Sequence, residues 1–170
     1  GKTTVLAKDT PAFIANRVGV FAIQDIFHTV AEMGLSVDEV DKLTGPVIGR
    51  AKSATFRTAD VVGLDTLALV ATGVKDNCPK DERSELFALP DYLNKMIENK
   101  WLGSKTKQGF YKKSKTAEGK RNIQVLDLNT LEYVDKKKVK FATLDMIKPI
   151  EDLNKRLAMA FMGMDKAGEF

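Results

Sequence analysis

A long helix over roughly residues 11–33 is the first element that the spacing of apolar residues predicts. The polar pair at positions 9–10 suits the N-cap, and Pro11 suits the first helical position. At about 100° per residue, Asn16 falls on the apolar side of this helix. That side also carries Val20, Ile23, Phe27 and Val30. Since a buried carboxamide without a hydrogen bond costs about 1–3 kcal/mol, Asn16 is expected to bind either another group of the core or a group from outside the chain.

Shorter helices follow in the next part of the chain. Ser36 and Glu39 form a capping box that predicts a short second helix. The segment 54–76 is predicted to form two helices, which separate around Gly63. Pro90 is expected to begin another helix that reaches about residue 99. The pattern therefore indicates a mainly α fold.

The two ends of the chain have a different pattern. Residues 2–8 read as a strand, and the polar, basic stretch 112–121 is expected to be flexible. Residues 123–128 and 131–134 alternate like a β-hairpin, with a two-residue turn at 129–130. From position 149 an amphipathic helix is predicted. Its apolar positions are Ile150, Leu153, Leu157, Ala160, Phe161 and Met164.

Charge adds little to this description, since the net charge is only +4. Most of the excess lies in two basic runs, 105–121 and 136–140. Solvated loops are the favoured interpretation, and contact with a phosphorylated ligand such as coenzyme A is the next. Nucleic acid is disfavoured as a partner, because only Phe110 and Tyr111 accompany the first run and form no stacking platform.

Cysteine content and hydropathy narrow the class of protein further. The lone Cys78 excludes an internal disulfide framework and fits a reducing compartment. One His and one Cys cannot assemble an ordinary structural zinc site. The sequence contains no apolar stretch of bilayer-spanning length and no signal peptide. We therefore expect a cytoplasmic protein with no membrane span and, because the chain does not begin with Met, a piece of a longer protein.

Three short motifs carry a resemblance to a known family. Residues 9–17 read DTPAFIANR, residues 60–66 read DVVGLDT, and residues 105–111 read KTKQGFY. They resemble, in order and spacing, the DTPGF(I/V)xNR, DxxGLDT and KTGxGFY motifs of the L-3-hydroxyacyl-CoA dehydrogenase family. The resemblance covers roughly residues 1–112. The chain departs from the family pattern at Ala12 and Lys107, which replace Gly, and at Ala51, where near relatives tend to have Pro.

The resemblance implies a fold and a domain organisation. The expected fold is the helical C-terminal domain of the 3-hydroxyacyl-CoA dehydrogenase type, similar to the C-terminal domain of 6-phosphogluconate dehydrogenase. Residues 1–8 are expected to be a linker or strand from a nucleotide-binding domain, and residues 9–112 the helical substrate and dimerisation domain. Residues 113–148 are expected to form a basic linker and β-hairpin. Residues 149–170 are expected to lead towards a second helical copy of the kind found in multifunctional fatty-acid oxidation proteins.

The resemblance also implies an activity, the NAD-dependent oxidation of L-3-hydroxyacyl-CoA to 3-oxoacyl-CoA in β-oxidation. The family's catalytic His–Glu pair and its glycine-rich NAD fingerprint belong to the nucleotide-binding domain, upstream of this chain. No Gly-x-Gly-x-x-Gly occurs here, so NAD is expected on the other domain and the isolated chain is expected to be inactive. His28 is interpreted as an ordinary helix histidine, exposed or half-buried, rather than as the base.

Site residues follow from the same resemblance. Asn16 matches the motif asparagine and is expected to position the substrate carbonyl or hydroxyl. Ser53 and Phe56 occupy the place of a stretch that lines the acyl pocket in relatives. They are candidates for substrate binding, with loop and core roles as the alternative. For Arg17, a solvated position or a pairing with an aspartate (Asp25 or Asp60) is favoured over phosphate binding.

Two further interpretations concern carboxylates and partners. Asp60 and Asp65 lie beside turns, so helix capping is favoured over a catalytic carboxylate pair. The expected partners are an acyl-CoA substrate, the nucleotide-binding domain and a second copy of the chain. The alternative functions are a non-catalytic helical oligomerisation module and, less favoured, a basic nucleic-acid-binding domain.

Overall fold

The computed structural model of the chain describes residues 1–116 and 118–170. Its α-helices are α1 Ala15–Met33, α2 Val37–Leu43, α3 Phe56–Val62, α4 Leu64–Asn77, α5 Asp91–Glu98, α6 Ala142–Ile147, α7 Leu153–Ala160 and α8 Lys166–Glu169. Short 3₁₀ turns are η1 Pro46–Ile48, η2 Ser84–Phe87 and η3 Ser104–Thr106. The strands are β1 Tyr111–Lys115, β2 Arg121–Leu126 and β3 Tyr133–Asp135. The fold is therefore mainly α with one small sheet, as predicted.

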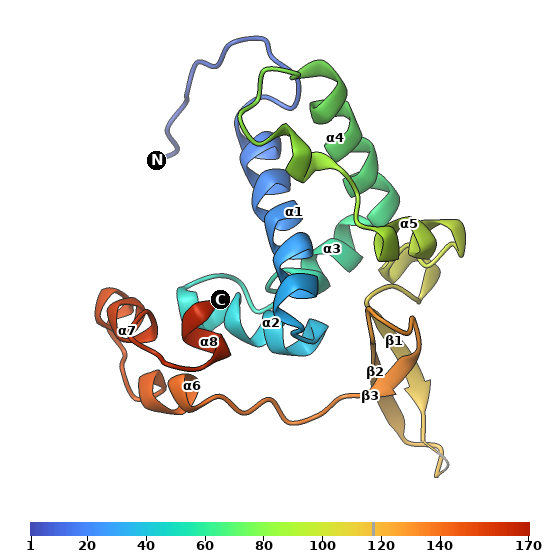
Figure 1. The fold of residues 1–170 in the computed structure, drawn as a ribbon, viewed down its shortest axis with the longest axis vertical. Coiled ribbons are helices and arrows are strands. Elements are labelled where there is room, and N and C mark those ends of the chain that lie inside the picture. The colour runs from blue at the N-terminus through green and yellow to red at the C-terminus, as the bar shows by residue number, and fades with distance from the viewer. Residues whose placement is uncertain (117) are drawn as a thin grey trace.

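Helix α1 runs through the middle of the molecule, and α4 packs beside it in the opposite direction (Figure 1). The predicted end of this helix near residue 33 is confirmed, because Gly34 takes the left-handed conformation with φ of 60° and stops the helix. The predicted separation at Gly63 and the helix after Pro90 are also confirmed. At the start of α2, the backbone N–H of Ser36 donates to Glu39 Oε2 at 2.8 Å, as the capping box requires.

Three phenylalanines from distant parts of the chain form the centre of the core. Phe27 on α1 and Phe56 on α3 stack with their ring centroids 5.3 Å apart. Phe110 meets Phe56 edge to face at 4.6 Å. All three are fully buried, and Tyr92 packs beside them while its hydroxyl donates to the carbonyl of Phe27. Aromatic contacts of this kind add to the free energy gained by burial alone.

The sheet differs in two ways from the prediction. It is antiparallel with order β1-β2-β3, so residues 112–115 form a strand rather than a flexible stretch, and Arg121 begins another. The remainder of the predicted flexible stretch includes residue 117, which lies outside the described residues. β1 pairs with β2 through backbone groups, which do not depend on side-chain charge. Successive side chains of β1 point to opposite faces of the sheet, so the lysines of the basic run do not prevent the pairing.

The hairpin of β2 and β3 is confirmed, but its two-residue turn is wrong. Leu126 pairs with Tyr133, so residues 127–132 form the connection. Asp127 explains the longer loop, because its Oδ1 accepts from the backbone N–H groups of Asn129 at 2.9 Å and Thr130 at 3.0 Å. Such a side-chain-capped turn competes with the shorter hairpin.

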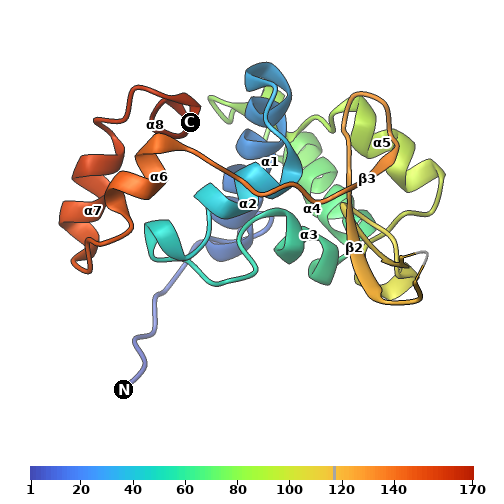
Figure 2. The same cartoon turned by 90° about the horizontal axis from the view of Figure 1, so that it is seen from below.

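The single helix predicted over 149–170 is wrong. The segment forms α7 and α8, and a further short helix, α6, precedes them. Two aspartates explain the breaks, because Asp152 caps α7 by accepting from Lys155 N and Asp165 caps α8 by accepting from Ala167 N. Figure 2 shows α6–α8 on the side of the molecule opposite the sheet.

The C-terminal helices are fastened to the helical body by long basic side chains. Arg156 on α7 donates through Nε to the carbonyl of Val47 in η1, at 2.7 Å. Lys166 on α8 donates to the carbonyl of Met33 at the end of α1, at 2.8 Å. These hydrogen bonds place α7 and α8 against the helical part of the chain that precedes them.

The N-terminus departs most from the prediction. Residues 1–10 are exposed and form no strand. Helix α1 begins at Ala15 rather than at position 11, and its N-cap, Ile14, makes no side-chain cap hydrogen bond. The delay has a backbone cause, because Ala12 and Phe13 adopt positive φ values of 62° and 48°, which break the helical path.

Candidate functional site

The first turns of α1 form the candidate site that the sequence singles out. Asn16 is exposed there, and within the described residues its side chain makes no hydrogen bond. The prediction that it lies on a buried face is wrong, because burial along α1 begins only at Val20. The amide is therefore open to a group from outside this chain.

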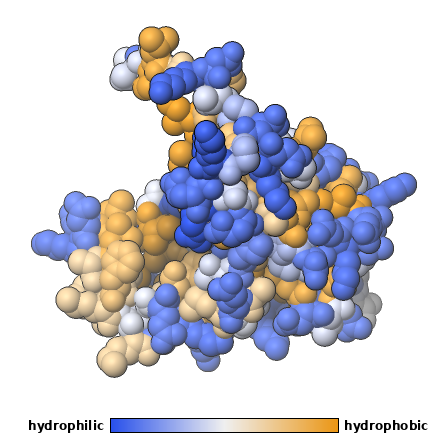
Figure 3. Space-filling view, turned by 45° about the horizontal axis from the view of Figure 1, so that its top comes forward, coloured by the Kyte–Doolittle hydropathy of each residue, from blue (hydrophilic) through white to orange (hydrophobic). Residues whose placement is uncertain are grey.

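Exposed apolar side chains lie next to Asn16 in the chain, both just before α1 and in its first turn. Phe13 is 59% exposed and Val18 is 64% exposed, with Ile14 between them in the chain and similarly open. Figure 3 shows further apolar surface along the N-terminal segment that projects from the body of the molecule. The C-terminal half of the same helix, by contrast, buries Phe27 and Val30 completely.

Arg17, next to Asn16, is held by a loop that the sequence does not point to. Its guanidinium forms an ion pair with Asp81, and this hydrogen bond holds the pKa of Asp81 below its usual value. The predicted pairings of Arg17 with Asp25 or Asp60 are wrong. Asp81 follows α4 in a loop, and no local pattern signals a partner so distant in sequence. The pair ties the first turn of α1 to the loop after α4.

The other predicted site residues lie apart from Asn16. Phe56 is fully buried in the aromatic core, which favours the core alternative over a surface on the acyl pocket. Ser53 is half-buried and accepts a hydrogen bond from the hydroxyl of Thr58 at 2.9 Å. His28 is half-buried, as expected, and its Nε2 lies 3.0 Å from the carbonyl oxygen of Ala88. A substrate role for Ser53 and Phe56 stays a prediction.

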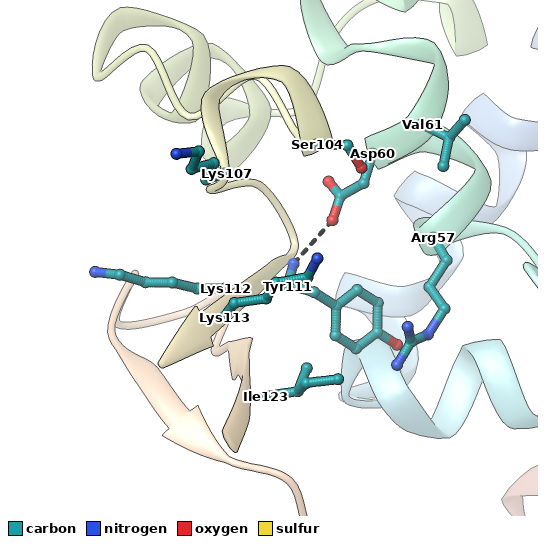
Figure 4. A pocket seen from close by; sticks show the side chains of 9 residues that line it. All are labelled: Arg57, Asp60, Val61, Ser104, Lys107, Tyr111, Lys112, Lys113 and Ile123. Atoms are coloured by element: carbon teal, nitrogen blue, oxygen red, sulfur yellow. Dashed lines mark hydrogen bonds between the residues drawn. The ribbon is translucent and has the colours of Figure 1, made fainter. Parts of the chain in front are cut away.

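Asp60 joins the second and third motifs, and it does so inside the protein (Figure 4). Its two carboxylate oxygens accept from the backbone N–H groups of Phe110 and Tyr111, each at 2.9 Å. The predicted helix-capping role is therefore wrong. Gly103 and Gly109 pack against Asp60 so closely that a Cβ at either position would overlap it. The glycine of the GFY segment is thus required by contact with the aspartate.

Burial controls the charge of this carboxylate. Desolvation raises the pKa of Asp60 to about 6, against the opposing effect of its two backbone hydrogen bonds. The nearby charge of Asp41 raises the pKa further, and that of Arg57 lowers it. Burial also raises the pKa of Asp41, whose oxygens accept from the first backbone N–H groups of α3 and from the Tyr111 hydroxyl. Asp41 thus caps α3. The sequence does not reveal this role, because only the fold brings Asp41 to the start of that helix.

The second aspartate of the DVVGLDT segment behaves differently. Asp65 lies at the surface in the first turn of α4, where it pairs with Lys105 at 2.6 Å. The hydrogen bond from Lys105 lowers the pKa of Asp65. The two motifs are therefore joined twice, once by a buried carboxylate and once by a surface ion pair.

These features define a class of protein, a helical domain in which two of the sequence motifs hold the core together. The N-terminal end of its longest helix is exposed at Phe13, Ile14, Asn16 and Val18, and we call this surface the open end of α1. None of the helices in the described part of the chain has the length and apolar character to cross a membrane. The model of the 3-hydroxyacyl-CoA dehydrogenase C-terminal domain matches residues 13–113. The chain therefore belongs to this family, and the resemblance carried by the three motifs is confirmed.

Relatives of known sequence support the assignment. A Bacillus subtilis protein described as a probable 3-hydroxyacyl-CoA dehydrogenase is 46% identical over 168 residues, which cover 99% of this chain. A protein of the same description from Deinococcus radiodurans is 47% identical over 115 residues, or 68% of this chain. The chain spans only 20% of the first relative and the match only 32% of the second.

A solved structure supports the fold. The crystal structure of M. tuberculosis FadB2 is similar with a TM-score of 0.54 and 31% identity. The similarity covers 67% of this chain and 38% of that protein. Together with the match of the family model, this similarity confirms the family fold predicted from the motifs.

Proposed function

We propose that this chain is the helical C-terminal domain of an NAD-dependent L-3-hydroxyacyl-CoA dehydrogenase of fatty-acid β-oxidation. The enzyme would oxidise the C3 hydroxyl of a 3-hydroxyacyl-CoA to a ketone and transfer hydride to NAD. The family assignment supports the reaction, and the lone cysteine, Cys78, is compatible with a cytoplasmic location.

The open end of α1 is the observation that carries the proposal. Among the described residues the side-chain amide of Asn16 is unpaired, and the apolar residues next to it in the chain are exposed. No other part of the chain that the structure describes covers them. A carboxamide that neither titrates nor supports the core suits the holding of a substrate carbonyl or hydroxyl. We assign Asn16 to substrate positioning, with the proton and hydride handled elsewhere.

A nucleotide-binding domain is the proposed partner of that surface. NAD would be bound there, since the sequence of this chain lacks the glycine-rich fingerprint that cradles a pyrophosphate. The apolar side chains of Phe13, Ile14 and Val18 would pack against that domain or against a second copy of the chain. Large exposed apolar patches mark such contacts.

An oligomerisation module without catalytic function is the remaining alternative. The same exposed side chains support it, but it gives no role to the free amide of Asn16. The two proposals differ in the enzyme activity they predict once the nucleotide-binding domain is added. Only the dehydrogenase proposal predicts NAD reduction.

NAD reduction with 3-hydroxybutyryl-CoA tests the proposal. The chain alone should be inactive, the longer protein with its nucleotide-binding domain should be active, and mixing the separated domains should restore part of the activity. If the longer protein folds, binds NAD and still fails to oxidise several chain lengths of 3-hydroxyacyl-CoA, the dehydrogenase proposal is wrong.

A further inference from the structure

Two basic pockets share Tyr111 in their lining, and Asn16 lines neither of them. Their volumes are about 180 Å³ and 340 Å³, and Arg57 and Tyr111 line both. We propose that these two pockets bind a pyrophosphate-bearing small molecule, with Arg57 between them as the principal phosphate ligand. The proposal rests on this chain alone and does not depend on the dehydrogenase assignment.

Arg57 is held in place while its donors stay free. Its Cζ lies 4.4 Å from the centroid of the Tyr111 ring, and the Tyr111 hydroxyl is fixed in turn by Asp41 at 2.8 Å. Among the described residues, the guanidinium forms no hydrogen bond and no ion pair. Figure 4 shows it beside the Tyr111 ring. A planar guanidinium that is held through its face presents its N–H edge to a phosphate.

The lining of the two pockets carries a large excess of positive charge. The basic residues are Arg57, Lys107, Lys112 and Lys113 in the first pocket, and Lys42, Lys52, Lys136, Lys137 and Lys138 with Arg57 in the second. None of these side chains belongs to an ion pair among the described residues. Such a concentration of like charge costs free energy unless an anion neutralises it.

The carboxylates that line the pockets offset only part of this charge, because one lies among four basic residues in the first pocket and two lie among six in the second. Asp60 uses one oxygen for the backbone N–H of Phe110 and the other for that of Tyr111. Asp41 is saturated by the N-terminal backbone of α3 and by the Tyr111 hydroxyl. Asp38 accepts from Ser36 through one oxygen, and its other oxygen is unpaired. The two pockets together therefore hold three carboxylates against nine basic residues.

The shape of the site favours a small phosphorylated molecule over nucleic acid. The second pocket alone lies within the usual range of small-molecule pockets, about 300–1,000 Å³. Single-stranded nucleic acid needs exposed rings on which bases stack. The one aromatic ring shared by these pockets, that of Tyr111, is already covered by Arg57, and Lys136 Nζ lies 5.6 Å from its centroid.

Titration calorimetry of the 170-residue chain at an ionic strength of about 0.15 M tests the proposal, with inorganic pyrophosphate, ADP and coenzyme A as probes. We expect saturable binding of pyrophosphate with one molecule per chain. Tighter binding of coenzyme A than of ADP would identify the natural ligand as a coenzyme A derivative. Tighter binding of ADP would identify it as a free nucleotide. Both outcomes support the site.

Matched variants locate the binding. Arg57→Gln should weaken pyrophosphate binding about tenfold or more, as expected for loss of a charge-assisted hydrogen bond. Arg57→Lys should recover only part of the affinity, because the charge returns without the planar fork. The double variant Lys107→Gln/Lys113→Gln removes exposed charges only, so it should weaken binding without loss of folding. Lys75→Gln on α4 is the control for net charge and should bind as the unmodified chain does.

Three results would overturn the proposal. The first is the absence of saturable pyrophosphate binding by a chain that melts cooperatively. The second is an equal loss of affinity in Lys75→Gln and in the Arg57 and lysine variants, which would mean that the chain binds anions through net charge. The third is tighter binding of duplex DNA than of any nucleotide, with a steep dependence on salt.

Discussion

The centre of the molecule and the open end of α1 treat the family motifs in opposite ways. At the centre, Asp60 and Phe110 are buried and their polar groups find partners within the chain. At the open end, Asn16 and Val18 are exposed and find none among the described residues. Both regions carry motif residues, so a motif by itself does not distinguish a structural role from a functional one.

The difference between the two regions lies in what satisfies each side chain. A residue whose burial and hydrogen bonds are completed by the chain itself is explained by folding. An exposed motif residue such as Asn16 is not explained by folding in this way. On this basis the DVVGLDT and KTKQGFY segments hold the domain together, whereas we propose that Asn16 of the DTPAFIANR segment faces another domain or a substrate.

Truncation of one aromatic residue should give the largest effect. Phe110→Ala removes a fully buried ring that contacts Phe27 and Phe56, and it should lower the free energy of unfolding by about 3–5 kcal/mol. Val18→Ala at the open end should change it by less than about 0.5 kcal/mol. Urea unfolding of the two variants measures both. Similar losses for the two would remove the distinction between the regions.

The two aspartates of one motif should also differ. Asp60→Ala leaves two buried N–H groups unpaired and should cost about 3 kcal/mol or more. Asp65→Ala breaks an exposed ion pair with Lys105 and should cost about 0–1 kcal/mol. Chemical unfolding at neutral pH compares them. A costly Asp65→Ala with a tolerated Asp60→Ala would contradict the buried role of Asp60.

Asp60 should also give stability a distinct pH dependence. Burial raises its pKa in the folded protein to about 6, from the ordinary value of 3.8. The folded state therefore binds the proton more tightly, so this contribution is present below about pH 4 and is lost as the pH rises to about 6. Each unit of pKa difference corresponds to about 1.4 kcal/mol. Asp60→Asn should flatten the stability profile between these values, and an unchanged profile would show that Asp60 does not titrate there.

The smallest predicted effect on stability concerns the two positions, 12 and 107, at which this chain lacks the glycine of the family motif. Ala12 and Lys107 have φ of 62° and 61°, a region that costs residues other than glycine about 1–2 kcal/mol. Ala12→Gly and Lys107→Gly should each raise the free energy of unfolding by about 1 kcal/mol at most. Ala31→Gly, in the regular part of α1, should lower it by about 0.5–1 kcal/mol. If all three lower it alike, the positive φ values carry no strain.

Local patterns predicted much of the fold. The helices around Gly63, the helix after Pro90 and the stop at Gly34 each depend on residues next to one another in the chain, which sequence reasoning can use. The alternation of apolar and polar residues also predicts the two strands of the hairpin within residues 121–135. It does not predict the turn between them, because the side chain of Asp127 favours a longer loop.

Contacts between distant residues could not be predicted. Asp60 reaches Phe110, and Arg17 reaches Asp81, only because the fold brings them together. The late start of α1 also escaped prediction, because Pro11 is compatible with a helix and the positive φ of Ala12 has no local signal. The helical spacing and the family motif both single out Asn16, but the spacing places it on a buried face, and its exposure is evident only from the structure.

The most direct test of the account compares Asn16→Ala with Asn94→Ala in the longer protein that carries the nucleotide-binding domain. Asn94 is an exposed asparagine on α5 and serves as the matched control. We predict that Asn16→Ala lowers kcat about a hundredfold, as loss of one preorganised donor does, with the KM for NAD and the melting temperature unchanged. Asn94→Ala should leave all three unchanged. An Asn16→Ala protein that keeps its kcat but melts at a lower temperature would show that the open end of α1 is structural and would contradict the account.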